Sequence, residues 1–263
     1  MLGHLISFRS NPERILFWKK DELCEFPLLG KCLNIRFSDS ILCTGYQDLD
    51  NHFRCPHGIR GRKQCAHCRN RDILKVYTRL DFEGYEAMRE EYVHQDFSVY
   101  LAQFGDSLIK CGVTRSERVE ERTHEQGADF WIELLRFHNG EEAYGAETAL
   151  QQIFGLKNFV RNSTKLELLG KKKTKAALEA KIKEIKNELE PNARAFADIE
   201  AFFCHESEIR ENAYPVPQSF GVSYSIDGTI TGSKAQMLFY EKEGKHFVVP
   251  MNESVGRVFL LKE

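Results

Sequence analysis

Residues 97–114 read Phe-Ser-Val-Tyr-Leu-Ala-Gln-Phe-Gly-Asp-Ser-Leu-Ile-Lys-Cys-Gly-Val-Thr, and the architecture of the chain can be built around them. The runs 97–102 and 108–114 are short and mostly apolar, and the five residues between them include the turn-forming sequence Gly-Asp-Ser. Two such runs joined by a short turn segment are typical of an antiparallel β-hairpin. We therefore expect a hairpin in the middle of the chain.

The segments that flank this hairpin favour alternating helices and strands. We expect a helix over 82–94, an exposed helix rich in arginine and glutamate over 115–126, a strand over 131–137 and a helix over 141–154. From the hairpin onward, the order is therefore β-β-α-β-α. Between 175 and 190, apolar residues recur at steps of three and four, which predicts one long helix.

Both ends of the chain favour β-structure. Within 33–43, apolar and polar residues alternate with the period of a half-buried strand. Near the C-terminus, the apolar runs 237–240 and 247–249 are separated by Glu-Gly-Lys, and an earlier turn is expected at Asp227-Gly228. We expect these C-terminal strands to complete an N-terminal sheet.

The composition is that of a globular protein. With 263 residues and 42% hydrophobic side chains, the chain can bury a sizeable core. It has no run of eighteen apolar residues and no signal-peptide pattern, so we expect a cytoplasmic protein with no membrane partner. Because 37 basic and 39 acidic residues leave a net charge of only −2, any attraction to nucleic acid must be local.

Four of the eight cysteines lie within residues 43–68, in the pattern Cys-x11-Cys-Pro-His-x7-Cys-Ala-His-Cys. The CxxC spacing lets two thiolates of one turn bind the same ion, and an upstream pair completes a tetrahedron, which favours a closed, structural Zn²⁺ site. We expect these ligands: Cys55, Cys65 and Cys68, with Cys43 or His57 as the fourth. The alternative is that the thiols are simply buried, but their polar neighbours build no apolar core. The isolated cysteines are expected to be packed or inert: Cys24, Cys32, Cys111 and Cys204.

The same segment is locally basic, since residues 53–79 contain a single acid, Asp72. Clustered cations of this kind indicate contact with the phosphates of DNA or RNA. The alternative is that they only offset the negative charge of the thiolates. The residues expected to contact nucleic acid are Arg54, Arg60, Arg62, Lys63, Arg69, Arg71, Arg115 and Arg118.

The central segment resembles a known superfamily. Ser98-Val-Tyr-Leu101, Leu108-Ile-Lys-Cys-Gly-Val-Thr114, Arg122 on a helix and Glu147 on a later helix are together similar to the GIY-YIG endonucleases, over residues 96–165. In this chain, a serine replaces the first glycine of that motif, and a lysine stands where the nucleases have their second tyrosine. The resemblance implies a small sheet flanked by helices, with these catalytic residues: Tyr100, Lys110, Gly112, Arg122 and Glu147.

A second resemblance spans most of the chain. The cysteine segment, the residues Lys110–Arg115, the stretch Arg122-Thr-His-Glu-Gln-Gly-Ala128 and the tail Asp227-Gly-Thr-Ile-Thr-Gly-Ser-Lys-Ala-Gln-Met-Leu238 resemble an uncharacterised family, a domain of unknown function (DUF2797). That family joins a cysteine motif to a GIY-YIG-like module. The resemblance implies no activity.

Phosphodiester cleavage gives each of the central residues a chemical role. Tyr100 would position or deprotonate the attacking water, which at neutral pH requires its pKa of about 10 to be lowered. Arg122 would hold a phosphate oxygen, and Glu147 would bind one Mg²⁺ or Mn²⁺. Gly112 would let the backbone pass close to the substrate or to a neighbouring helix.

Structural alternatives exist for the same residues. A tyrosine in a central strand is commonly a core residue, and Arg122 has acidic neighbours that could pair with it at the surface. Glu147 is harder to explain structurally, because it lies among small and apolar residues, where a carboxylate without a partner is costly.

The expected fold class is therefore α+β, with a zinc-containing β unit formed by both chain ends. The expected segments are the β-rich unit over 1–80, the GIY-YIG-like module over 95–170, a helical segment over 171–213 and the completing strands over 214–263. The expected function is nucleic-acid binding, together with divalent-metal-dependent phosphodiester cleavage. The alternatives are an inactive nucleic-acid-binding protein or a zinc-stabilised adaptor between proteins. The sequence carries no sign of the oligomeric state.

Overall fold

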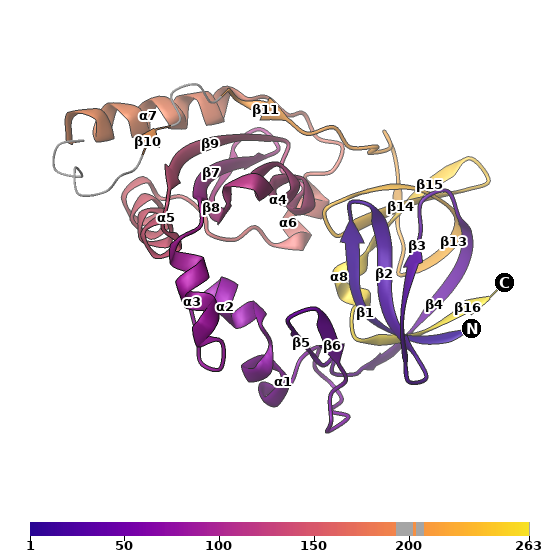
Figure 1. The fold of residues 1–263 in the computed structure, drawn as a ribbon. Helices are drawn as coiled ribbons and strands as arrows, with labels where there is room; N and C mark the ends of the chain where they lie inside the picture. Colours follow the sequence, from indigo (N-terminus) through magenta and orange to yellow (C-terminus); the bar gives the residue numbers. More distant parts are fainter. Residues whose placement is uncertain (193–201, 204–207, 263) are drawn as a thin grey trace. The chain divides into compact units, whose positions relative to one another are not determined.

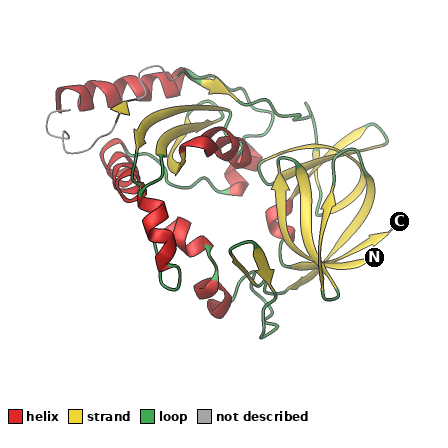
Figure 2. Cartoon of the chain, viewed as in Figure 1, coloured by secondary structure: helices red, strands yellow, loops and turns green. Residues whose placement is uncertain are grey.

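The computed structural model describes residues 1–192, 202–203 and 208–262. The chain is a mixed α+β protein that forms two compact units, drawn in Figures 1 and 2. Unit 1 comprises Met1–Tyr85 and Tyr214–Glu263, and unit 2 comprises Glu86–Ala213. Cys204 and parts of the expected helical segment 171–213 lie outside the described residues.

The described residues of unit 1 form a nine-stranded sheet that contains strands from both ends of the chain. Neighbouring strands are antiparallel, except that β12 and β15 are parallel. In order across the sheet, the strands are β12 (Gly221–Val222), β15 (Lys245–Pro250), β14 (Met237–Lys242), β13 (Ser225–Lys234), β4 (Cys32–Ile41), β16 (Arg257–Lys262), β1 (Leu2–Ser10), β2 (Glu13–Lys19) and β3 (Glu22–Pro27).

This sheet curls strongly, as its strands in Figure 2 show. Strands β13 and β1 are separated by β4 and β16 in the sheet order, yet Ser233 of β13 donates a hydrogen bond to the carbonyl oxygen of Ser10, at 3.0 Å. The curl encloses a core made of residues from seven strands, to which Leu28 and Met251 add side chains from outside the strands. Within it, the rings of Phe17 and Phe259 pack edge to face, with 5.3 Å between centroids. The alternation predicted for 33–43 is confirmed by β4, whose Leu33 and Ile35 are buried.

The turn predicted at Asp227-Gly228 is wrong, because both residues lie inside β13. At Gly228, a Cβ atom would lie 2.2 Å from the carbonyl oxygen of Glu241 in the paired strand β14. The glycine therefore allows a close approach of two backbones rather than a reversal of the chain.

The rest of unit 1 consists of short elements. A two-stranded hairpin is followed by two helices, and one further helix precedes the last strand. These elements are β5 (Tyr46–Asp48), β6 (Asn51–Phe53), α1 (Ala66–Arg71), α2 (Leu74–Arg79) and α8 (Met251–Ser254).

Unit 2 is built around the predicted hairpin, which the pairing of β7 with β8 confirms. Strand β9 pairs with the other edge of β7, and two short strands pair with β9. The strands are β7 (Phe97–Phe104), β8 (Leu108–Arg115), β9 (Phe130–Phe137), β10 (Phe202–Phe203) and β11 (Arg210–Glu211). The helices are α3 (Glu86–Val93), the 3₁₀ turn η1 (Ser116–Arg118), α4 (Val119–Gln126), α5 (Gly140–Phe154), α6 (Asn162–Glu167) and α7 (Ala176–Asn192).

The central strand β7 is buried along its whole length. It lies between β8 and β9, and the helices α4, α5 and α7 approach it. Its side chains therefore point into packed surroundings on both faces of the sheet. Tyr100, in the middle of the strand, is opposite Gly112 of β8.

Candidate functional site

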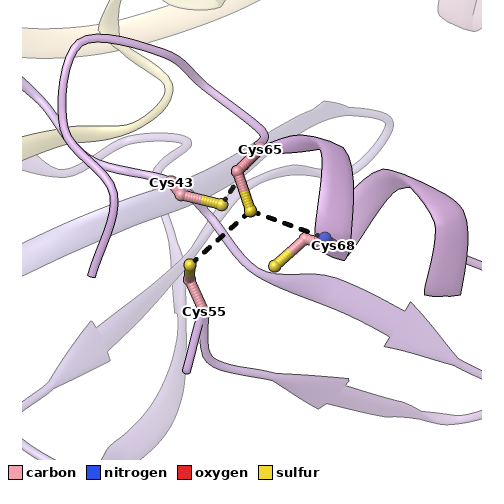
Figure 3. Close-up of side chains that lie close together, drawn as sticks. All are labelled: Cys43, Cys55, Cys65 and Cys68. Atoms are coloured by element: carbon pink, nitrogen blue, oxygen red, sulfur yellow. Dashed lines mark hydrogen bonds between the residues drawn. The ribbon is translucent and has the colours of Figure 1, made fainter. Parts of the chain in front are cut away.

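Four cysteine side chains in unit 1 point toward one another (Figure 3). All four sulfur atoms lie within 4.8 Å of one another, and those of Cys55 and Cys65 are 3.8 Å apart. A tetrahedral Zn²⁺ ion with Zn–S bonds of about 2.3 Å has sulfurs about 3.8 Å apart. The four cysteines, Cys43, Cys55, Cys65 and Cys68, could therefore bind a metal ion such as zinc.

Local structure positions these thiols. Cys65 is the N-cap of α1, and its sulfur accepts a hydrogen bond from the backbone amide of Cys68, at 3.5 Å. The backbone amide of Cys65 donates in turn to the sulfur of Cys43, at 3.3 Å. Burial raises the pKa of Cys55. Hydrogen bonds with the backbone of Ile59 and His57 and with two neighbouring thiols outweigh this effect and lower the pKa to about 7. Cys55 therefore ionises to the metal-binding thiolate more readily than an ordinary thiol, whereas burial raises the pKa values of Cys43 and Cys68.

The fourth thiol of the group is Cys43, and His57 does not belong to it. The exposed imidazole of His57 instead packs edge-on against His67, with 4.7 Å between ring centroids. Proximity in sequence to Cys55 therefore does not bring this ring to the sulfurs. Of the isolated cysteines in the described residues, Cys111 is buried and Cys32 is exposed.

The expected phosphate-contacting residues fall into two groups. Arg60, Arg62 and Arg69 are exposed, and none has an ion-pair partner among the described residues. Arg71 is also exposed, and its guanidinium lies 5.9 Å from the ring centroid of Tyr46.

The other four cations are engaged within their own units. Arg54 pairs with Asp21 at 3.0 Å and stacks 4.7 Å over the Trp18 ring, while Lys63 donates a hydrogen bond to the carbonyl oxygen of Asn252. Two arginines of unit 2 pair with nearby glutamates: Arg115 with Glu117 of η1 at 3.5 Å, and Arg118 with Glu121 of α4 at 2.9 Å.

A second cluster lies in unit 2, around the hydroxyl group of Tyr100. A Cβ atom on Gly112 would lie 2.5 Å from this hydroxyl oxygen and 3.1 Å from Nζ of Lys110. The amide of Gln126 in α4 donates a hydrogen bond to the same oxygen, at 2.7 Å. The absence of a side chain at Gly112 therefore leaves the space into which the phenol and the ammonium group extend.

Charged groups surround the phenol. Burial lowers the pKa of Lys110, and the carboxylate of Glu147 opposes this shift. Burial raises the pKa of Glu147. The positive charge of Lys110 and a hydrogen bond from the amide of Gln151 both oppose this rise. Arg122 acts electrostatically on both Tyr100 and Lys110. The five residues expected from the GIY-YIG resemblance thus lie in one neighbourhood within unit 2.

The expected role of Tyr100 as a base does not fit its surroundings. The residue is 1% exposed, and its ring packs with Val119, Trp131 and other core side chains. Burial raises the pKa of Tyr100, and Arg122 opposes this only in part. The phenol therefore keeps its proton at neutral pH, because it is sealed in the core rather than exposed to water.

Two structural alternatives hold for the same cluster. Tyr100 is a core residue, and Arg122 forms a surface ion pair with Glu125, at 3.1 Å. Around Glu147, the described residues bring together no group of three potential metal-binding side chains. The expected Mg²⁺ or Mn²⁺ would depend on one carboxylate, with water and substrate oxygens as the remaining ligands.

Sequence reasoning missed Gln126, the residue that holds the tyrosine hydroxyl. A signal was available, because Gln126 follows Arg122 by four residues on α4, and residues four apart share one face of a helix.

The fold and the cysteine group define a mixed α+β protein whose four convergent thiols could bind a metal ion. The family model described as Protein of unknown function (DUF2797) matches residues 30–257, and the chain belongs to this family. No curated protein and no solved structure matches the chain. The GIY-YIG resemblance stays a prediction. None of the helices in the described residues is long and apolar enough to cross a membrane.

Proposed function

We propose that the chain binds nucleic acid through the segment around the four cysteines, and that a structural Zn²⁺ ion holds this segment in shape. The observation that supports this is the exposure of Arg60, Arg62 and Arg69, none with an ion-pair partner among the described residues, beside four convergent thiols. Unpaired guanidinium groups on a fixed surface bind phosphate oxygens well.

The case for a structural ion rests on what surrounds the sulfurs. The buried cluster at this place consists of Cys43, Cys65 and Cys68, with Cys55 and Tyr46 packed against it, and it contains no aliphatic side chain among the described residues. Such a cluster buries little apolar area, so the segment needs another source of stability. Four thiolates form a closed tetrahedral site, which stabilises folded structure and leaves no open position for catalysis.

Replacing the three unpaired arginines in the variant Arg60→Gln/Arg62→Gln/Arg69→Gln is expected to weaken binding of DNA or RNA. Each cation that no longer neutralises a phosphate reduces the magnitude of the slope of log K against log salt by about 0.7 to 0.9, so the loss of three should reduce it by about 2 to 3. Fluorescence anisotropy of a labelled oligonucleotide at several salt concentrations measures this slope.

The matched control is Lys20→Gln/Lys245→Gln/Lys262→Gln, which removes the same charge from three exposed lysines of unit 1 outside the segment. It should leave the slope almost unchanged, and both variants should keep their zinc. Equal slopes in the two variants would mean that the arginines only balance the thiolates. Binding that ignores salt, or no binding at all, would favour the protein-interaction adaptor.

The second candidate function is metal-dependent phosphodiester cleavage in unit 2. The observation that favours it is that Lys110, whose Nζ lies beside Gly112, interacts electrostatically with both Glu147 and Arg122. In this proposal, the two cations stabilise negative charge on the phosphate, and Glu147 binds the divalent ion. The buried phenol of Tyr100 positions its neighbours and does not act as the base.

Cleavage of labelled single-stranded, duplex and branched substrates in Mg²⁺ or Mn²⁺ tests this candidate. Loss of a group that stabilises the transition state costs about a hundredfold in rate, so Glu147→Ala should abolish most activity. Glu142→Ala, an exposed change on the same helix, is the control and should cleave normally. Equal rates in the two variants would exclude this site.

A further inference from the structure

The segment between α5 and α7 carries a second concentration of positive charge. Residues 157–175 contain seven lysines and arginines and a single acid, Glu167. Two of the cations, Lys173 and Lys175, are held in ion pairs of 2.9 and 3.2 Å. Four others are exposed and have no ion-pair partner in the part of the chain that the structure describes: Lys157, Arg161, Lys171 and Lys172. We call residues 157–175 the basic strip.

An aromatic ring stands among these cations. Phe159 is 66% exposed, the highest value among the large apolar side chains of the described residues. Its neighbours Leu156 and Val160 are 8% and 4% exposed and fix the backbone on either side. Leu156 and Val160 thus point into the protein and anchor this stretch of chain, while the Phe159 ring faces solvent.

Hydrogen bonds hold the basic strip along the β7–β8 hairpin. The backbone amide of Cys111 in β8 donates to the carbonyl oxygen of Lys157 at 2.9 Å, and the amide of Lys157 donates to Ile109 at 3.3 Å. At the other end, the side-chain amide of Gln103 in β7 donates to the carbonyl oxygen of Thr174. The strip therefore follows the hairpin, and its start lies next to Lys110.

We propose that the basic strip binds single-stranded nucleic acid, with the Phe159 ring stacked on an unpaired base and the four unpaired cations on successive phosphates. Base–aromatic stacking together with a cationic track is the combination that binds single strands, whereas the bases of a duplex are already stacked on one another. The class of ligand rests on the proposed function, but the surface lies in unit 2 and does not use the cysteine segment.

The test compares a labelled single-stranded oligonucleotide with the corresponding duplex, by anisotropy on the full chain. Loss of one stacked base typically costs about tenfold in affinity, so Phe159→Ala should weaken single-strand binding by about that factor. Duplex binding should change by less than about twofold, because no base is free to stack. Phe159→Trp keeps a stacking surface and should bind the single strand at least as well as the original chain.

The matched control is Tyr224→Ala, which removes an aromatic ring of nearly equal exposure, 65%, from unit 1. It should leave single-strand binding unchanged. The variant Lys171→Gln/Lys172→Gln should reduce the salt slope for the single strand by about 1.4, at about 0.7 for each phosphate neutralised.

The outcomes separate this inference from the proposed function. If Phe159→Ala binds the single strand normally while the arginine variant of unit 1 binds poorly, the basic strip is not a binding surface and the proposed function stands. If the original chain binds no nucleic acid, both are wrong. Binding of the same variants to phosphatidylserine vesicles is measured in parallel. If Phe159→Ala binds nucleic acid normally and loses only its binding to the vesicles, the strip is a membrane-facing surface and the inference is overturned.

Discussion

Cys65→Ser is expected to abolish zinc binding and to unfold residues 43–72 while the curled sheet of unit 1 remains folded. Cys65 supplies one of the four convergent sulfurs and also caps α1. Serine is a favoured N-cap, so this substitution keeps the cap and removes the soft ligand. Structural Zn²⁺ typically contributes about 10–16 kcal/mol of binding free energy at pH 7, which exceeds what this small segment can gain from burial.

Zinc content, measured by mass spectrometry of metals, should fall from about one ion per chain to nearly none. Hydrogen exchange should show loss of protection over 43–72 only, because the sheet has its own core around Leu5, Phe17 and Phe259. Chelation of zinc from the unaltered chain should have the same effect.

The matched controls are Cys24→Ser and Cys32→Ser, two cysteines of unit 1 outside the sulfur group. Both should retain zinc and protection. If Cys65→Ser keeps the hydrogen-exchange protection of the original chain, the segment folds without metal and the structural role is refuted.

Much of the fold could be predicted because local signals were strong. The hairpin consists of two short apolar runs joined by turn-forming residues, and the helices α5 and α7 have apolar residues at the helical period. The cysteine spacing likewise predicted a metal centre, because CxxC geometry is set within one turn of chain. It left the choice between Cys43 and His57 open, since that choice depends on where β4 ends relative to α1.

The features that could not be predicted arise from contacts between distant segments. Gly228 was expected in a turn, because the sequence does not show that the backbone of β14 approaches it. The burial of Tyr100 depends on three separate elements that cover β7, namely β8, β9 and α4. Its raised pKa follows from that burial, so the expected base could only be corrected in three dimensions.

Gly112→Ala is expected to lower the free energy of unfolding of unit 2 by about 1–3 kcal/mol, the usual cost of overpacking a core. The added Cβ would lie 2.5 Å from both Cζ and Oη of Tyr100, and the phenol cannot withdraw, because it is 1% exposed and held by Gln126. It would also lie 3.1 Å from Nζ of Lys110, so the same change should disturb the proposed phosphate site. Urea denaturation followed by tryptophan fluorescence measures the stability.

The control for this substitution is Gly145→Ala on α5. A Cβ at Gly145 meets nothing within 4 Å, and alanine is a better helix former than glycine by about 1 kcal/mol, so this variant should be neutral or more stable. The double variant Tyr100→Leu/Gly112→Ala should lose less stability than the two single changes together, because leucine removes the ring that the new methyl group strikes. Strict additivity would place the cost elsewhere than at the contact between residues 100 and 112. The arrangement of Tyr100, Lys110 and Glu147 would then not depend on the absence of a side chain at Gly112.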